Sequence, residues 1–142
     1  MNAYFVTCTG CEKDENGNVT VVHCTYDPET KSGSGFTARK VKGTIHWVAA
    51  RTAVTVECRL YENIVDEEKG KLNEDGSLNL NPNSLTIIKN CYVEPALAEA
   101  KPYDSYQFVR NGFFCADCKD STSEHLVFNR IVSLKSSFKI AK

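Results

Sequence analysis

The stretch VTVECRLY, residues 54–61, is the clearest strand pattern in this sequence. Its members alternate between two sets, Val54, Val56, Cys58 and Leu60 against Thr55, Glu57, Arg59 and Tyr61. Because the side chains of a strand point alternately to its two faces, this period of two predicts one buried face and one face toward water. A single strand is not stable in water, so its partners must come from elsewhere in the chain.

Further short β-rich segments flank this stretch and are separated by turn signals. They are residues 3–8, 18–26, 39–48, 84–93, 105–110, 113–118 and 126–134. No long window carries a helical period, and only EPALAEA, residues 94–100, predicts a single helical turn. The pattern predicts an all-β fold, a closed barrel or a sandwich, with at most one or two short helical turns.

Two Asn-Gly steps and one charged segment mark connections between the predicted strands. Asn16-Gly17 and Asn111-Gly112 each supply the positive φ angles that a tight hairpin turn needs. Residues 62–77 are charged, contain glycine and are poor in apolar side chains. This composition predicts that residues 62–77 are an exposed, mobile loop of a domain that spans residues 1–142.

Composition narrows the class of protein. The 142 residues suit one domain with a real core. The net charge is −1 and the pI about 6.3, so any nucleic-acid site must be a local patch. No apolar run reaches membrane-spanning length, and MNAYFVTC lacks the charged start and apolar core of a signal peptide. We expect a soluble, cytoplasmic protein whose seven cysteines are reduced.

A basic cluster opens RKVKGTIHWV, residues 39–48, which contains the only tryptophan. A strand here would put Lys40, Lys42, Thr44 and His46 on one face and Val41, Ile45 and Trp47 on the other. One interpretation is a half-buried strand whose lysines keep it soluble or pair with Glu57 or the acidic loop. The other is a cationic strip, formed by Arg39, Lys40 and Lys42, that contacts phosphate.

The cysteine spacing raises a metal-binding alternative. Cys8 and Cys11 form one C-x-x-C pair, and Cys115 and Cys118 form another. Two such pairs can surround a tetrahedral Zn²⁺ with four thiolates, which would define a zinc-stabilised structural or protein-interaction domain. Most of the chain separates the pairs, whereas zinc ribbons place the second pair within roughly 15–20 residues. We therefore expect no metal, and we expect Cys24, Cys58 and Cys91 to pack as small apolar side chains.

No catalytic arrangement stands out. The histidines are His23, His46 and His125, and none falls in an H-E-x-x-H motif, a nucleophile elbow or a Ser/His/Asp order. Phosphate-cradling glycine loops and paired reactive groups are missing as well. We expect no catalytic site and no cofactor within this chain.

Several segments, in order along nearly the whole chain, resemble one known family. They are NAYFV, HCTYDPET, RKVKGTIHWV, VECRLYENI, LNPNSL, EPALAEA, YQFVRNGFFCAD and VFNRIVSLK. The sequence resembles the C-terminal anticodon-binding region of bacterial-type glutaminyl-tRNA synthetases, within the class I glutamyl/glutaminyl family. The resemblance implies a closed or partly open antiparallel β-barrel with complex, Greek-key-like connections. It also implies an upstream catalytic domain that uses ATP and Mg²⁺, and tRNA for glutamine as partner. Since HIGH-like and KMSKS-like motifs are missing, we expect a piece of a longer polypeptide whose Met1 is not native.

The resemblance also implies two base-reading residues. Gln107 and Arg110 match the Gln-x-x-Arg pair that contacts the middle anticodon base, a uridine, in this family. The chemistry is suitable, because an amide can accept from the uracil N–H and donate to a carbonyl, while a guanidinium donates to the other carbonyl or to phosphate. Residues i and i+3 of a regular strand face opposite ways, so we expect the turn at Asn111-Gly112 to bring both into a shared solvent-accessible hollow. The family's residues for the other two bases lie mostly upstream.

Overall fold

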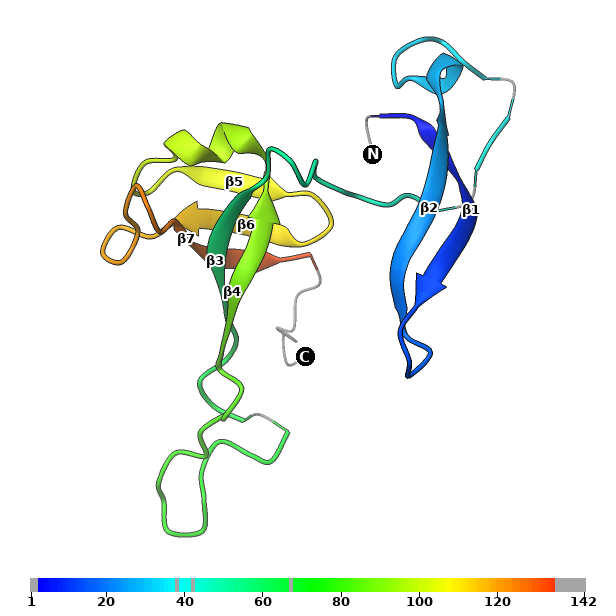
Figure 1. Ribbon diagram of the computed structural model, residues 1–142. Coiled ribbons are helices and arrows are strands. Elements are labelled where there is room, and N and C mark those ends of the chain that lie inside the picture. The colour runs from blue at the N-terminus through cyan, green and yellow to red at the C-terminus, as the bar shows by residue number, and fades with distance from the viewer. Residues whose placement is uncertain (1–2, 38, 42, 67, 135–142) are drawn as a thin grey trace. The chain divides into compact units, whose positions relative to one another are not determined.

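The computed structural model describes residues 3–37, 39–41, 43–66 and 68–134. In these ranges it contains seven strands and two short 3₁₀ helices (Figure 1). They are β1 Phe5–Lys13, β2 Val19–Asp27, η1 Pro28–Thr30, β3 Val54–Tyr61, β4 Leu85–Val93, η2 Pro95–Glu99, β5 Ser105–Phe108, β6 Gly112–Ala116 and β7 Val127–Ser133. The predicted β class is confirmed, whereas the barrel stays a prediction. No helix in the described ranges has the length and apolar character to span a bilayer.

The chain divides into two compact units, Met1–His46 and Trp47–Lys142. The chain length alone predicted a single domain. The first unit contains a two-stranded sheet, β1-β2. The second contains a five-stranded sheet in the order β4-β3-β7-β6-β5. The hydrophobic core formed by the described residues belongs to the second unit.

The first unit is built on the antiparallel β1–β2 hairpin, with Cys8 opposite Cys24. Its turn falls where Asn16-Gly17 predicts it, but of these two residues only Gly17 has a positive φ, 83°. The Asp14 carboxylate accepts hydrogen bonds from the backbone N–H of Asn16 at 2.9 Å and of Asn18 at 2.8 Å. A further hydrogen bond from the Asn18 side chain is the main reason that the pKa of Asp14 is lowered.

The second unit places VTVECRLY at an inner position of its sheet. β3 pairs with β4 antiparallel and with β7 parallel, and this parallel pair departs from the antiparallel expectation. Val56 and Cys58 are buried in the core, as the alternation predicts. Glu57 was expected on the wet face, yet it is buried as well. Its carboxylate remains paired there, because Arg59 donates to it at 2.7 Å.

The core forms where aromatic side chains from three strands meet. Phe108 of β5 stacks on Phe114 of β6, with ring centroids 4.4 Å apart. Phe128 of β7 contacts Phe108 at 5.4 Å and Tyr106 at 5.9 Å between centroids. Leu97, from η2, packs against this core at its border. The short helix thus closes the connection between β4 and β5 (Figure 1).

Residues 39–48 do not form the predicted strand. The described part of this stretch pairs with no other strand, and its apolar side chains Val41, Ile45 and Trp47 are exposed. The strand predicted from the alternating pattern is therefore wrong for these residues, because a strand also needs a neighbouring strand that supplies the ladder of hydrogen bonds. The stretch instead runs across the division between the two units, which falls after His46.

The segment 62–77 lies between β3 and β4 and extends beyond the ends of both strands (Figure 1). Its described residues are exposed apart from Val65 and Asp66, which are half-buried. Two isolated β-bridges, Val65 to Leu80 and Leu72 to Leu78, pair this segment with the residues that follow it. The mobility suggested by its composition stays a prediction.

Candidate nucleic-acid interface

The β5–β6 hairpin carries both predicted base-reading residues. On β5, Tyr106 and Phe108 contact the core, so the alternation turns Gln107 to the other face. Gln107 is exposed and pairs in register with Phe113 of β6. The sheet therefore presents Gln107 on a strand whose opposite face is anchored by aromatic packing.

Three residues, Val109, Arg110 and Asn111, join β5 to β6. The backbone N–H of Asn111 donates to the carbonyl of Phe108 at 2.8 Å and closes the turn. Arg110 has φ 71°, in the left-handed region that few residues other than glycine occupy. The Asn111-Gly112 step predicts a turn one residue later. The turn comes earlier because Gly112 already pairs with Phe108 on one side and with Ser133 on the other.

Gly112 is held in place by its neighbours. Its φ is 143°, and a Cβ added there would lie 2.6 Å from the carbonyl oxygen of Val132. Only glycine allows β6 to approach β7 this closely at the point where the turn ends. The position of the Arg110 turn therefore depends on Gly112.

The structure places Gln107 and Arg110 at the same end of one hairpin, both exposed. It excludes the arrangement in which Gln107 is buried in the core. Their convergence on one hollow stays a prediction. Because strand register pairs Ser105 with Cys115, the cysteine pair lies at the opposite end of this hairpin.

The predicted basic strip of Arg39, Lys40 and Lys42 lies partly within the described residues. Arg39 donates from Nη2 to Asp27 Oδ2 at 2.8 Å and lies over the Phe5 ring, 5.5 Å from its centroid. Its partner is thus in the first unit, not Glu57 or the acidic loop. Lys40 is exposed. Lys42 lies outside the described residues.

Two arginines of the second sheet are engaged by carboxylates. Arg59 donates to Glu57 and, at 2.5 Å, to Asp120, and these bonds, that with Asp120 first, raise the pKa of Arg59. Arg130 donates to Glu62. A guanidinium held in this way stabilises the fold and offers less positive charge to a phosphate.

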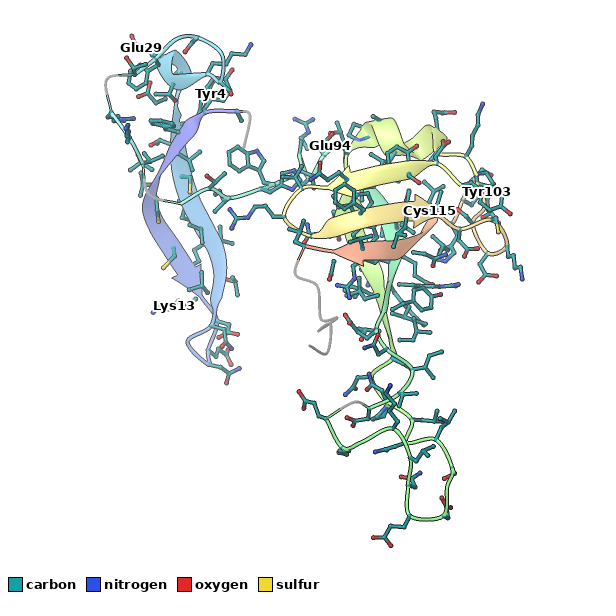
Figure 2. All side chains as sticks on the ribbon, turned by 180° about the vertical axis from the view of Figure 1, so that it is seen from behind. Tyr4, Lys13, Glu29, Glu94, Tyr103 and Cys115 are labelled. Atoms are coloured by element: carbon teal, nitrogen blue, oxygen red, sulfur yellow. The ribbon has the colours of Figure 1, made fainter. Side chains whose placement is uncertain are left out.

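The two C-x-x-C pairs lie in different units. Cys8 and Cys11 belong to the first unit, and Cys115 and Cys118 to the second. In the part of the chain that the structure describes, no three Cys, His, Asp or Glu side chains are grouped so as to hold a metal ion. Near the second pair, Tyr103 lies at the same end of the sheet as Cys115 (Figure 2). A hydrogen bond with the Cys118 side chain is the main cause that raises the pKa of Tyr103.

The three cysteines expected in the core differ in environment. Cys58 is buried, Cys91 is half-buried and Cys24 is exposed. Burial raises the pKa of the Cys58 thiol, and the neighbouring Cys91 raises it further. The expectation for Cys24 is wrong because, among the described residues, β2 pairs with β1 alone, and its side chains in this two-stranded sheet stay exposed.

Comparison with known proteins decides the family. A family model described as tRNA synthetases class I (E and Q), anti-codon binding domain, matches residues 44–117, just over half of the chain. The chain belongs to this family. It is also similar to glutamine–tRNA ligases. That of Clostridium perfringens is 56% identical over 142 residues, covering 97% of this chain and 25% of the ligase.

Other relatives of the family agree. The glutamine–tRNA ligase of Clostridioides difficile is 57% identical over 145 residues, covering 99% of this chain and 26% of the ligase. That of Clostridium kluyveri is 48% identical over 141 residues, covering 98% and 25% respectively. The chain therefore spans about a quarter of the length of these relatives, and the family resemblance stated from its motifs is confirmed.

Two features of the structure, one in each unit, were not predicted from the sequence. The pairing of Arg39 with Asp27 joins positions far apart in the chain, and no local pattern signals it. The outward position of Phe113 did have a signal. Two consecutive phenylalanines in one strand point to opposite faces, so burial of Phe114 requires that Phe113 face outward.

Proposed function

We propose that this chain is the C-terminal anticodon-binding part of a glutamine–tRNA ligase. The similarity to such ligases over 97% of the chain carries this proposal. The parent enzyme would attach glutamine to its tRNA with ATP and Mg²⁺ in the cytoplasm, with its catalytic domain outside this chain. We also propose that the second sheet is part of a partly open barrel. The register shifts in the β3–β4 and β6–β7 pairings support the barrel, because bulges increase the local twist of a sheet.

Within this function, Gln107 and Arg110 read the middle uridine of the anticodon. The amide of Gln107 accepts from the uracil N–H and donates to a carbonyl, and Arg110 donates to the second carbonyl or to phosphate. Their exposure at one hairpin end supports this assignment. Cytosine inverts the pattern at two positions, so a paired contact of this kind discriminates by about 1–3 kcal/mol.

The test is aminoacylation by the parent ligase with Arg110→Ala. We expect a loss in kcat/KM on tRNA with the cognate anticodon that largely disappears on a tRNA with another middle base. Arg51→Ala, an exposed arginine outside the hairpin, is the matched control and should change neither value. Equal losses on both tRNAs would mean that Arg110 supplies general affinity, and the base-reading assignment would fall.

Contacts to the RNA backbone are proposed for Lys40, Lys42 and Arg39. The exposure of Lys40 supports the proposal, whereas Arg39 would first have to leave Asp27. Replacing Lys40 and Lys42 by alanine should weaken tRNA binding by the parent ligase and reduce the salt slope by roughly one unit per lost phosphate contact. An unchanged affinity and salt slope would remove this role.

The isolated chain should bind RNA weakly. Its net charge is −1, and most phosphate contacts of a whole synthetase lie outside it. We expect a dissociation constant on the order of 10⁻⁴ M or poorer for an anticodon stem-loop at physiological salt. Titration followed by NMR covers this range.

A further inference from the structure

A row of side chains crosses three neighbouring strands on the face opposite to the core. Gln107 of β5 is directly opposite Phe113 of β6, and Phe113 is directly opposite Val132 of β7, at the last pair before the β6–β7 register shifts. Residues opposite one another in antiparallel strands share a face, with Cβ atoms about 4.5–5.5 Å apart. Gln107, Phe113 and Val132, which we name the outer row, therefore form one continuous strip.

The outer row is exposed even though it contains two large apolar side chains. Phe113 is 43% exposed and Val132 is 54% exposed. On the other side of the same strand, Phe114 is 3% exposed and stacks on Phe108. The core is therefore complete without Phe113, whose ring is left beside an exposed amide.

The charge around the outer row suits a polyanion. The sequences of β5, β6 and β7, SYQF, GFFCA and VFNRIVS, contain no aspartate or glutamate, and the Glu62 carboxylate that reaches β7 is paired with Arg130. The turn that joins the first two strands carries Arg110. An aromatic ring flanked by an amide and close to a guanidinium is the combination that binds an unstacked nucleobase. The ring stacks on the base, the amide bonds to its edge, and the cation faces the phosphate.

We propose that Phe113 is the stacking platform for the anticodon base whose edge Gln107 reads, with Val132 extending the apolar strip beside the ring. This inference rests on the proposed function and adds a contact residue to it. The occupant of the outer row is thus a base splayed out of a single-stranded RNA loop. Stacking supplies affinity for any base, and the hydrogen bonds of Gln107 supply the selection.

The experiment titrates the 142-residue chain with a synthetic RNA hairpin that carries a glutamine anticodon, followed by NMR. In the complex, the H5 and H6 protons of the middle uridine should move upfield, since they would lie over an aromatic ring. Phe113→Leu should abolish this shift and weaken binding about five- to a hundredfold. Phe113→Tyr keeps the ring and should retain both the upfield shift and affinity within about twofold.

Tyr92→Leu is the matched control. Tyr92 is an exposed aromatic residue on β4, the strand at the other edge of the same sheet. It should leave both the affinity and the uridine shift unchanged. Urea unfolding of each variant checks that Phe113→Leu is folded, and the Phe113→Tyr result stands independently of that check.

Three outcomes would overturn the inference, and they differ in what they leave standing. Binding with unchanged affinity and shift in Phe113→Leu would remove the platform and keep the proposed function. Nuclear Overhauser contacts from the Phe113 ring to residues of the first unit in the RNA-bound chain, with none to RNA, would show that protein covers the outer row. No upfield shift of the uridine protons in the complex of the unsubstituted chain would also remove the platform, whereas the proposed function is tested separately, by aminoacylation with the parent ligase.

Discussion

The two units use similar strand sequences with opposite results. β2, VTVVHCTYD, is richer in β-branched residues than β3, VTVECRLY. Yet every residue of β2 is exposed except the half-buried Asp27, whereas β3 buries Val56, Glu57 and Cys58. The difference lies in the neighbours, since β2 has one partner strand and β3 has two and a core beneath it. Strand propensity thus selects the local conformation, and packing decides burial.

The same contrast separates their sources of stability. Burying a Val or Phe side chain contributes about 1.5–3 kcal/mol, and the second unit does this repeatedly. In the described part of the first unit, the only buried residue is Thr30. Its Oγ1 accepts from the backbone N–H of Phe5 at 2.8 Å and donates to the carbonyl of Asp27 at 2.7 Å. A two-stranded sheet of this kind is marginal on its own in water, so hydrogen bonds carry more of its stability.

The largest expected effect comes from the core of the second unit. Phe128 is 0% exposed, and Phe128→Ala removes a ring that contacts Tyr106 and Phe108. We expect a loss of about 3–5 kcal/mol in the free energy of unfolding, measured by urea denaturation with circular dichroism. Val22→Ala on exposed β2 should change it by less than about 0.5 kcal/mol. Similar values for the two variants would show that the units are stabilised alike.

The second prediction concerns the closest approach of two strands. Gly112→Ala places a Cβ 2.6 Å from a backbone carbonyl at a φ of 143°. Backbone strain of this kind should lower the free energy of unfolding by about 1–3 kcal/mol. Gly10→Ala in β1 is the control, because a Cβ there meets nothing within 4 Å. An unchanged free energy of unfolding in Gly112→Ala would mean that β6 and β7 can separate at the turn without loss of stability.

The third prediction tests the hydrogen bonds of the first unit. Thr30→Val keeps the side-chain shape but leaves the N–H of Phe5 without its acceptor. An unsatisfied buried donor costs about 1–3 kcal/mol, so amide exchange of β1 and β2 should accelerate while the second unit is unchanged. Ser34→Ala removes an exposed hydrogen bond to the carbonyl of Glu29 and should have little effect. If both units exchanged faster in Thr30→Val, they would not be independent.

The smallest effect is a pH dependence. Asp117 accepts from the backbone N–H groups of Asp120 and Lys119 and from the Asn129 side chain. These bonds, that from Asp120 first, lower the pKa of Asp117. A lowered folded-state pKa stabilises the fold above the unfolded value near 3.8, and this contribution is lost as pH falls through the folded value.

Urea unfolding between about pH 5 and pH 2 should therefore show an acid loss that Asp117→Asn reduces. Asp14, whose pKa is also lowered, lies in the turn of the first unit. Asp14→Asn should leave the acid loss of the second unit unchanged and affect only amide exchange in its own hairpin. An equal effect of both substitutions on the second unit would contradict the separation of the units.

Much of the fold could be predicted because its signals are local. The Asn16-Gly17 turn, strand β3 and the single turn of η2 follow from φ preferences and from side-chain period. The strand expected at 39–48 had the same quality of pattern, yet its described residues form no strand. The turn at Arg110 was displaced by one residue, since the pairing of Gly112 with Ser133 overrides a local preference.

The sequence by itself determined the family, the β class and the identity of Gln107 and Arg110 as candidate base readers, since motifs and turn chemistry are carried by consecutive residues. The tertiary structure alone decided that Arg39 bonds to Asp27 and that Glu57 is buried beside Arg59. It also decided that Phe113, rather than Phe114, is the phenylalanine facing outward next to Gln107. The physical reason is that strand register and burial depend on partners distant in the chain, and no stretch of local sequence encodes which partners these are.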